Sequence, residues 1–255
     1  MNTFFQDWYY LSIRNIKLIW RPLMALIPPL FMPIFFFVVN SLSLQSFAQV
    51  PGFPDVSYKD FIAPVAIFTA IFFSAGNAGI ELVQDIQSGY FKKLVIMPIN
   101  RLAIILAKLT EVAVQAVLQG VIMLVLLLMW GVNFEGGFLG LLAIFAILIL
   151  FAMAWSCLSM IFALRTQNAR LVQSMFILVF PLLYLTTSQA PKELLPATFA
   201  TLASYNPVTY IIEAIRALTL QGFGVPAIAH GFWAASGMFV VLVTLTLTSF
   251  RKALK

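Results

Sequence analysis

Charge is almost absent from long stretches of this chain, and that scarcity limits what the chain can fold into. The run Phe138–Ala163 has no charged residue, and of all 255 residues only 9% are charged while 62% are hydrophobic. Soluble domains carry about 25% charged residues, so a soluble fold of this length could not cover its surface. Intrinsic disorder requires low hydrophobicity and high charge, so this chain is not expected to be disordered either. The chain is therefore predicted to be an integral membrane protein.

The apolar runs are long and continuous, which favours membrane-spanning helices over the short alternating strands of a membrane β-barrel. We expect an all-α integral membrane protein with a single transmembrane domain over residues 1–255. The six predicted transmembrane helices cover residues 23–47, 61–82, 102–130, 138–164, 171–188 and 227–250. An even number of spans places both termini on the same side of the membrane.

Residues 3–21 precede the first span and have two unlike helical faces. Basic residues share one face, and aromatic residues such as Trp8 and Trp20 fall on the other. This pattern is typical of an amphipathic helix lying in the membrane interface, which we predict here. The alternative is a short cytoplasmic helix packed on other parts of the protein. The following apolar stretch is too long for the core of a cleavable signal peptide, so the N-terminus is expected to be retained.

The basic residues fall mostly on one side of the predicted spans. Twelve of the fifteen lie in the N-terminal segment, after the second span, after the fourth span or at the C-terminus. The other side receives Lys59, Lys192 and Arg216. Because cytoplasmic loops collect Lys and Arg, both termini are predicted to be cytoplasmic, in a multi-pass protein of the cell (plasma or inner) membrane.

The segment 84–101, between the second and third spans, is too apolar for a free loop and too polar to cross the membrane. A short amphipathic helix against the cytoplasmic membrane surface fits it, with Gly89 and Pro98 near its ends. Such a helix would present Lys92 and Lys93 to a cytoplasmic partner. A plain loop anchored by positive charge is the alternative.

Two motifs in this order resemble those of type-2 ABC transporter permeases. The segment 84–101 resembles their cytoplasmic coupling segment, D-x-x-x-G-aromatic-x-x-x-L-x-x-x-P-x-x-R, through Asp85, Gly89, Tyr90, Leu94, Pro98 and Arg101. A later stretch is similar to their N-P-x-[ST]-Y-x-x-[DE]-x-x-R signature, through Asn206, Pro207, Tyr210, Glu213 and Arg216. Length, span number and the N-terminal helix also match, so the resemblance covers the whole chain. Asp85 and Tyr90 are closer to the drug-resistance branch than to polysaccharide exporters.

The resemblance implies the membrane subunit of an ATP-driven exporter. Two permease subunits, identical or different, would work with two copies of a cytoplasmic ABC ATPase subunit. ATP and Mg²⁺ would be bound by that ATPase, since this chain has no G-x-x-x-x-G-K-[ST] phosphate loop. ATP-driven closure would push on the segment 84–101 and the N-terminal helix, moving a hydrophobic or amphiphilic cargo such as a drug-like compound or lipid. The cargo itself and the direction of transport are left open by the residues.

The second motif also has a local physical interpretation. Asn206 can cap a helix that begins at Pro207, and Gly222 can end it. Glu213 and Arg216, three residues apart, can pair on one face. Residues 189–224 are predicted to form an external re-entrant helical hairpin before the last span, as the resemblance also implies. An ordinary surface helix is the alternative.

Polar residues inside the predicted spans are few. In the third span, spacing places Lys108, Glu111, Gln115 and Gln119 on one face. Such groups either serve function or join helices, and joining helices is the expectation for Lys108 and Glu111. Asn77, Gln115 and Gln119 are weak candidates for a substrate path. In the second span, the small residues around Gly76 and Gly79 permit close helix packing.

Three other classes of function compete with an exporter. A secondary transporter or channel would show internal repeats and acids within spans; no repeat is evident, and Glu111 is the one acid we assign to a span. A membrane-embedded enzyme would need convergent nucleophiles or metal ligands, whereas the chain has one histidine, His230, and one cysteine, Cys157. No metal site is expected. The third competing class of function is a membrane anchor for another subunit.

Overall fold

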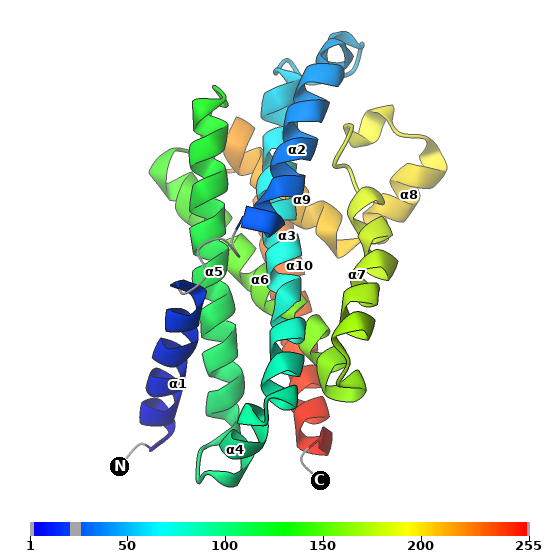
Figure 1. Ribbon diagram of the computed structural model, residues 1–255. Coiled ribbons are helices and arrows are strands. Elements are labelled where there is room, and N and C mark those ends of the chain that lie inside the picture. Colours follow the sequence, from blue (N-terminus) through cyan, green and yellow to red (C-terminus); the bar gives the residue numbers. More distant parts are fainter. Residues whose placement is uncertain (1–2, 21–26, 254–255) are drawn as a thin grey trace.

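The computed structural model describes residues 3–20 and 27–253, and this part of the chain is helical with no strand (Figure 1). The predicted first span begins at residue 23, so its start lies outside the described residues. The same is true of Arg21 and Lys255 in the basic clusters. The predicted all-α class is confirmed.

Four of the described helices are long and apolar enough to cross a membrane. They are α3 (Tyr58–Gln87), α5 (Arg101–Met129), α6 (Gly137–Thr166) and α10 (Pro226–Ala253). At 1.5 Å per residue, each is about 40 Å long or more, beyond a hydrocarbon core of about 30 Å. The second span was predicted to end at residue 82, but α3 continues to Gln87, so the polar residues 84–87 extend the helix. These helices make the chain a multi-pass membrane protein.

Two further apolar helices are shorter. Helix α2 (Ile27–Ser43) has Pro28 and Pro29 in its first turn and Pro33 inside it, and a 3₁₀ turn (η2, Gln45–Gln49) follows. Helix α7 (Ala169–Tyr184) ends well before the predicted residue 188. Proline at the first turn costs no helical hydrogen bond, which is why α2 tolerates the first two.

Helix α3 lies in the middle of the molecule and is packed against α2, α5, α6, α7 and α9 (Figure 1). Its rings stack on α6: the centroids of Phe68 and Phe151 are 4.4 Å apart. About three turns further along α3, α3 and α6 approach so closely that a Cβ at Gly79 would lie 2.5 Å from the carbonyl oxygen of Ser159. The Ser159 hydroxyl also donates to the Gly76 carbonyl oxygen at 2.5 Å. The small-residue patch predicted here is confirmed as the contact between these helices.

At the opposite end from the termini, a short 3₁₀ turn (η3, Lys192–Leu194) precedes α8 (Ala197–Tyr205) and α9 (Pro207–Leu220). Most of α9 is buried, because it packs against α3, α6 and α10. Helix α9 is therefore part of the core and not a surface appendage.

Helix α1 (Thr3–Trp20) stands alongside α5 and runs roughly parallel to it (Figure 1). The structure thus shows α1 packed on another part of the protein, which was the alternative to a helix lying in the membrane interface. Ser12 and Asn15 are buried on this contact, whereas Phe5, Tyr9 and Tyr10 are exposed. The start of α1, the end of α10 and the short helix α4 (Tyr90–Ile96) share one end of the molecule.

Candidate functional site

The segment 84–101 contains a short helix between two breaks. Helix α3 ends at Gln87, and Gly89 caps α4 with a φ of 74°, a conformation that disfavours residues with a Cβ. Helix α4 ends at Ile96, and Pro98 follows two residues later in the exposed link to α5. Asn100 then caps α5, its side chain accepting from the amide of Leu102 at 3.0 Å. Gly89 and Pro98 therefore lie at the two ends of the helix, as the sequence predicts.

Helix α4 is amphipathic. Phe91 and Leu94 are buried, and the Phe91 ring meets Phe250 of α10 edge-on with centroids 5.5 Å apart. Lys92 and Lys93 are exposed on the other side, and Arg101 is exposed at the start of α5. The apolar side anchors α4 to the helical bundle, which leaves the two lysines available for contact with another molecule.

Asp85 and Tyr90 are both held by Arg14 of α1. The guanidinium lies 3.9 Å from the Asp85 carboxylate and 3.6 Å from the centroid of the Tyr90 ring. Partial burial raises the pKa of the Tyr90 hydroxyl, and the nearby Arg14 opposes this only in part. These contacts connect the N-terminal helix to both sides of the Gly89 turn.

Two more contacts fix α1 against α5. The indole of Trp8 donates to the Thr110 hydroxyl at 3.0 Å, and the Asp7 carboxylate accepts from the Asn100 amide at 3.2 Å. Sequence reasoning did not single out Asp7, Trp8 or Arg14 as site residues. Their partners lie between 71 and 102 residues away along the chain, and no local spacing could reveal them.

An ion cluster joins α3 to α5 close to this end. The Lys108 ammonium lies 2.5 Å from a Glu81 oxygen and 2.9 Å from a Glu111 oxygen. We call these three residues the inner ion cluster. Glu81 lies within the second predicted span, so the assignment of Glu111 as the only acid in a span was wrong. Glu81 lies four residues before Asp85, which places the two acids on one helical face. This spacing is the sequence signal that could have identified Glu81.

The inner ion cluster borders a groove between α1, α3 and α5 with a volume of about 450 Å³. Asn77 and Gln115, two of the candidate path residues, line this groove. Gln119 does not line it: its side chain is fully buried in the core and neither polar atom has a hydrogen-bond partner in the structure. Asn77 also lines a second groove of about 510 Å³, between α3 and α7. Asn77 therefore faces open space on both sides of α3.

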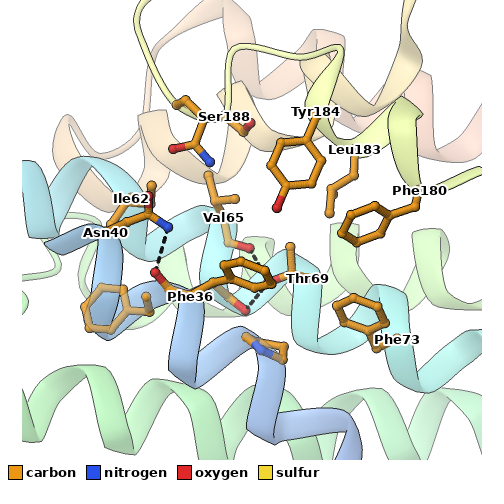
Figure 2. A pocket seen from close by; sticks show the side chains of 14 residues that line it. Phe36, Asn40, Ile62, Val65, Thr69, Phe73, Phe180, Leu183, Tyr184 and Ser188 are labelled. Atoms are coloured by element: carbon orange, nitrogen blue, oxygen red, sulfur yellow. Dashed lines mark hydrogen bonds between the residues drawn. The ribbon is translucent and has the colours of Figure 1, made fainter. Parts of the chain in front are cut away.

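An apolar crevice lies between α2, α3 and α7 (Figure 2), and Phe73 lines both this crevice and the second groove. Two polar side chains of the crevice bond within their own helices: the Asn40 amide donates to the Phe36 carbonyl oxygen, and the Thr69 hydroxyl donates to that of Val65. The crevice has a volume of about 30 Å³, enough for a single water and far below the several hundred Å³ of drug-sized sites. It is closed to a drug-sized cargo in this conformation.

The second motif forms a separate polar site at the opposite end of the molecule. Asn206 caps α9 by accepting from the Val208 amide at 3.0 Å, with Pro207 as the first residue of the helix. Its amide nitrogen donates to the carbonyl oxygens of Leu182 and Leu185, at 2.6 and 2.9 Å. The cap predicted from sequence is confirmed. Tyr210 donates its hydroxyl to the Ser204 carbonyl oxygen at 2.7 Å, which holds α8 to α9.

Glu213 and Arg216 do not form the ion pair that their spacing allows. Glu213 accepts from the Thr187 hydroxyl at 3.0 Å. Arg216 donates to the backbone carbonyl oxygens of Phe61, Thr187 and Ser188, at 2.9 to 3.3 Å, and lies over the Phe61 ring. Both side chains bind the non-helical, buried segment that follows α7. The carbonyl groups of this segment have no helical partners, and Arg216 supplies donors to two of them. We call Asn206, Glu213 and Arg216 the outer clasp.

No group of three histidine, cysteine or acidic side chains lies close enough to hold a metal ion within residues 3–20 and 27–253. Cys157 is buried and unpaired by disulfide. His230 lies beside Tyr210, with ring centroids 6.3 Å apart.

Comparisons with known proteins agree on one class of membrane protein. Residues 6–220 match the family described as ABC-2 type transporter. Over 165 residues, the chain is 28% identical to a protein named transport permease ycf38 in Cyanophora paradoxa; this covers 64% of the chain and 56% of the relative. The chain thus spans little more than half of that relative's length.

Two further relatives align over most of the chain. The doxorubicin resistance ABC transporter permease protein DrrC of Mycobacterium tuberculosis is 22% identical over 234 residues. The daunorubicin resistance ABC transporter permease protein DrrB1 of Streptomyces coeruleorubidus is 24% identical over 253 residues. In each case 91% of the chain and 84% of the relative are covered.

Proposed function

Because the chain belongs to the ABC-2 type transporter family, we propose that it is the membrane-spanning subunit of an ATP-driven exporter. Two such subunits, identical or different, work with two cytoplasmic ATPase subunits that bind ATP and Mg²⁺. The single observation that carries this proposal is the geometry of α4. It is a short helix anchored by Phe91 and Leu94, with Lys92 and Lys93 exposed toward the same end as both termini.

The proposed topology has six spans with α4 and both termini in the cytoplasm. Helices α2 and α7 cross the membrane together with the four longer helices. At 1.5 Å per residue they are about 25 Å long, a modest shortfall that the bilayer can accommodate by thinning or by helix interactions. The excess of Lys and Arg near α4 and the termini supports this orientation.

In this topology α8 and α9 form the external re-entrant hairpin before the last span. Non-helical backbone is tolerated at membrane depth only where protein covers it or where it lines a cavity. The burial of α9 and the outer clasp on residues 187–188 meet that condition, which supports the proposal.

The proposed cargo is a hydrophobic or amphiphilic compound, either drug-like or a lipid. Two relatives are named for doxorubicin and daunorubicin resistance, so doxorubicin is the first cargo to test. The grooves on either side of Asn77 are large enough to admit such a molecule. A secondary transporter is the second candidate, favoured by the charged inner ion cluster at span depth.

Co-purification tests the exporter proposal. The chain is expressed with the ATPase encoded beside it, and the complex is reconstituted in lipid nanodiscs. We expect a stable complex that hydrolyses ATP, and at least a tenfold loss of complex formation in Lys92→Glu/Lys93→Glu. Lys192→Glu is the matched control: it reverses an exposed lysine at the opposite end and should leave the complex intact.

The absence of any complex with the neighbouring ATPase would refute the exporter proposal. Doxorubicin uptake into vesicles that follows an ion gradient and ignores ATP would favour the secondary transporter instead. Normal complex formation and ATP hydrolysis in the double charge reversal would refute the role of α4 alone.

A further inference from the structure

The inner ion cluster lies outside both sequence motifs, but its place in the chain connects it to α4. Glu81 is about two turns before the end of α3, and Lys108 is about two turns after the start of α5. All of α4 lies between them in sequence. The ion pair between Lys108 and Glu81 therefore joins the two long helices that carry α4.

Helix α4 is linked to each of these helices by a short non-helical segment. The Gly89 turn precedes it, and residues 97–100 follow it. A helix held between two such links can change its angle without moving its neighbours, because backbone torsions in the links absorb the motion. Something beyond the links must make α3 and α5 respond together when α4 is displaced.

The pair of Lys108 and Glu81 is the direct polar connection between α3 and α5. Among residues 3–20 and 27–253, no other hydrogen bond or ion pair runs between these two helices. The Lys108 side chain is 13% exposed and that of Glu111 7%, so water competes weakly for the ammonium. Glu111, one turn along α5, holds that ammonium in place. Glu81 itself is 37% exposed, so the protection from water comes from the burial of Lys108 and Glu111. In the ion pair from α3 to α1, by contrast, Arg14 and Asp85 are 3.9 Å apart and both are about a third exposed, a class of contact that contributes little.

We propose that Lys108 is a positioning residue that closes α3, α4 and α5 into one mechanical unit. A displacement of α4 then moves the inner ends of α3 and α5 together. Without the ammonium, no ion pair joins Glu81 to α5, so the same displacement separates the two helices. This inference rests on the proposed function, because it takes the ATPase as the source of the displacement.

The test measures the distance between α3 and α5 during ATP turnover. Spin labels are placed at Gln84→Cys and Leu106→Cys, which are exposed on the two helices, in a Cys157→Ser background. The full complex with the neighbouring ATPase is studied in nanodiscs, without nucleotide and trapped with ATP and vanadate. We expect one narrow distance distribution in both states for the labelled parent protein.

In Lys108→Met we expect the distribution to at least double in width in the trapped state only, while the rate of ATP hydrolysis stays within twofold. Lys108→Arg keeps the charge and should restore the narrow distribution. Lys17→Met removes an exposed lysine from α1 and should change nothing. ATP hydrolysis shows that the complex is folded and assembled, so a narrow trapped-state distribution in Lys108→Met overturns the proposal.

Equal broadening with and without nucleotide also overturns the proposal, since it would make Lys108 a static contact only. Failure of the parent chain to bind the ATPase would instead refute the proposed function. The two failures are thus distinguishable in one set of samples.

Discussion

The inner ion cluster and the outer clasp use charged side chains in opposite ways. In the inner cluster, Lys108 meets other side chains, Glu81 and Glu111, that come from two separate helices. In the outer clasp, Arg216 meets the carbonyl oxygens of Thr187 and Ser188, in a segment that has left the helical state, and that of Phe61 in α3. One joins helices to each other, and the other supplies hydrogen bonds that the backbone itself lacks.

The difference predicts different consequences of mutation. An ion pair between side chains can open and reform, because each partner can turn toward water or toward the bordering groove. Buried carbonyl groups have no such choice, and each one left without a donor costs about 1–3 kcal/mol. The outer clasp should therefore dominate stability, whereas the inner cluster should affect how helices move relative to one another.

The largest effect is expected for Arg216→Met. The substitution keeps much of the apolar stem but leaves the non-helical carbonyl oxygens of Thr187 and Ser188 without their donor, so unfolding should become easier by about 3 kcal/mol or more. Thermal unfolding of the purified chain in detergent measures this. Lys192→Met, an exposed change at the same end, is the control and should leave the midpoint in place.

Asn206→Ala should cost about 2 kcal/mol. The change removes the cap of α9 and frees the carbonyl oxygens of Leu182 and Leu185. The same unfolding assay measures it, and proteolysis after α7 should become faster. A midpoint unchanged from the parent would show that the amide contacts are dispensable and would weaken the comparison.

Glu111→Gln is expected to have a smaller effect, about 1 kcal/mol. Lys108 keeps Glu81 as its partner, and glutamine preserves the shape of the side chain. If this variant proved less stable than Arg216→Met, the contrast between the two clusters would be reversed, and the inner cluster would be the main structural support.

Arg14→Gln should have the smallest effect on stability, below about 1 kcal/mol, because its ion pair with Asp85 is long and partly exposed. Raising the salt concentration should weaken the same contact in the parent protein. Complex formation with the ATPase at low and high salt checks this, and a large loss of the folded protein in Arg14→Gln would contradict it.

Local features of the fold were readable from the sequence. The side chain of Asn206 can cap a helix, and the fixed φ of Pro207 suits its first residue. Helix α9 begins at this position in the structure. Gly89 and Pro98 likewise mark the ends of α4. Composition indicated a membrane protein, since so little charge cannot cover a soluble surface, and the long continuous apolar runs indicated helices.

Contacts between distant parts of the chain were not readable. The sequence allowed Arg216 to pair with Glu213, yet Arg216 binds Phe61 and the segment after α7, which only the tertiary fold brings near. The amphipathic pattern of α1 predicted a helix lying on the membrane, but the same pattern also suits a helix packed along α5. Periodicity identifies an apolar face without saying whether lipid or protein covers it.

The central claim is that α4 is the part of the chain that meets the ATPase. Site-specific photo-crosslinking from position 93 in native membranes tests it most directly, with position 192 as the comparison at the opposite end. We predict that the ATPase subunit is captured from position 93 and not from position 192. Capture from position 192 alone, or from neither position while the complex remains intact, would contradict the claim.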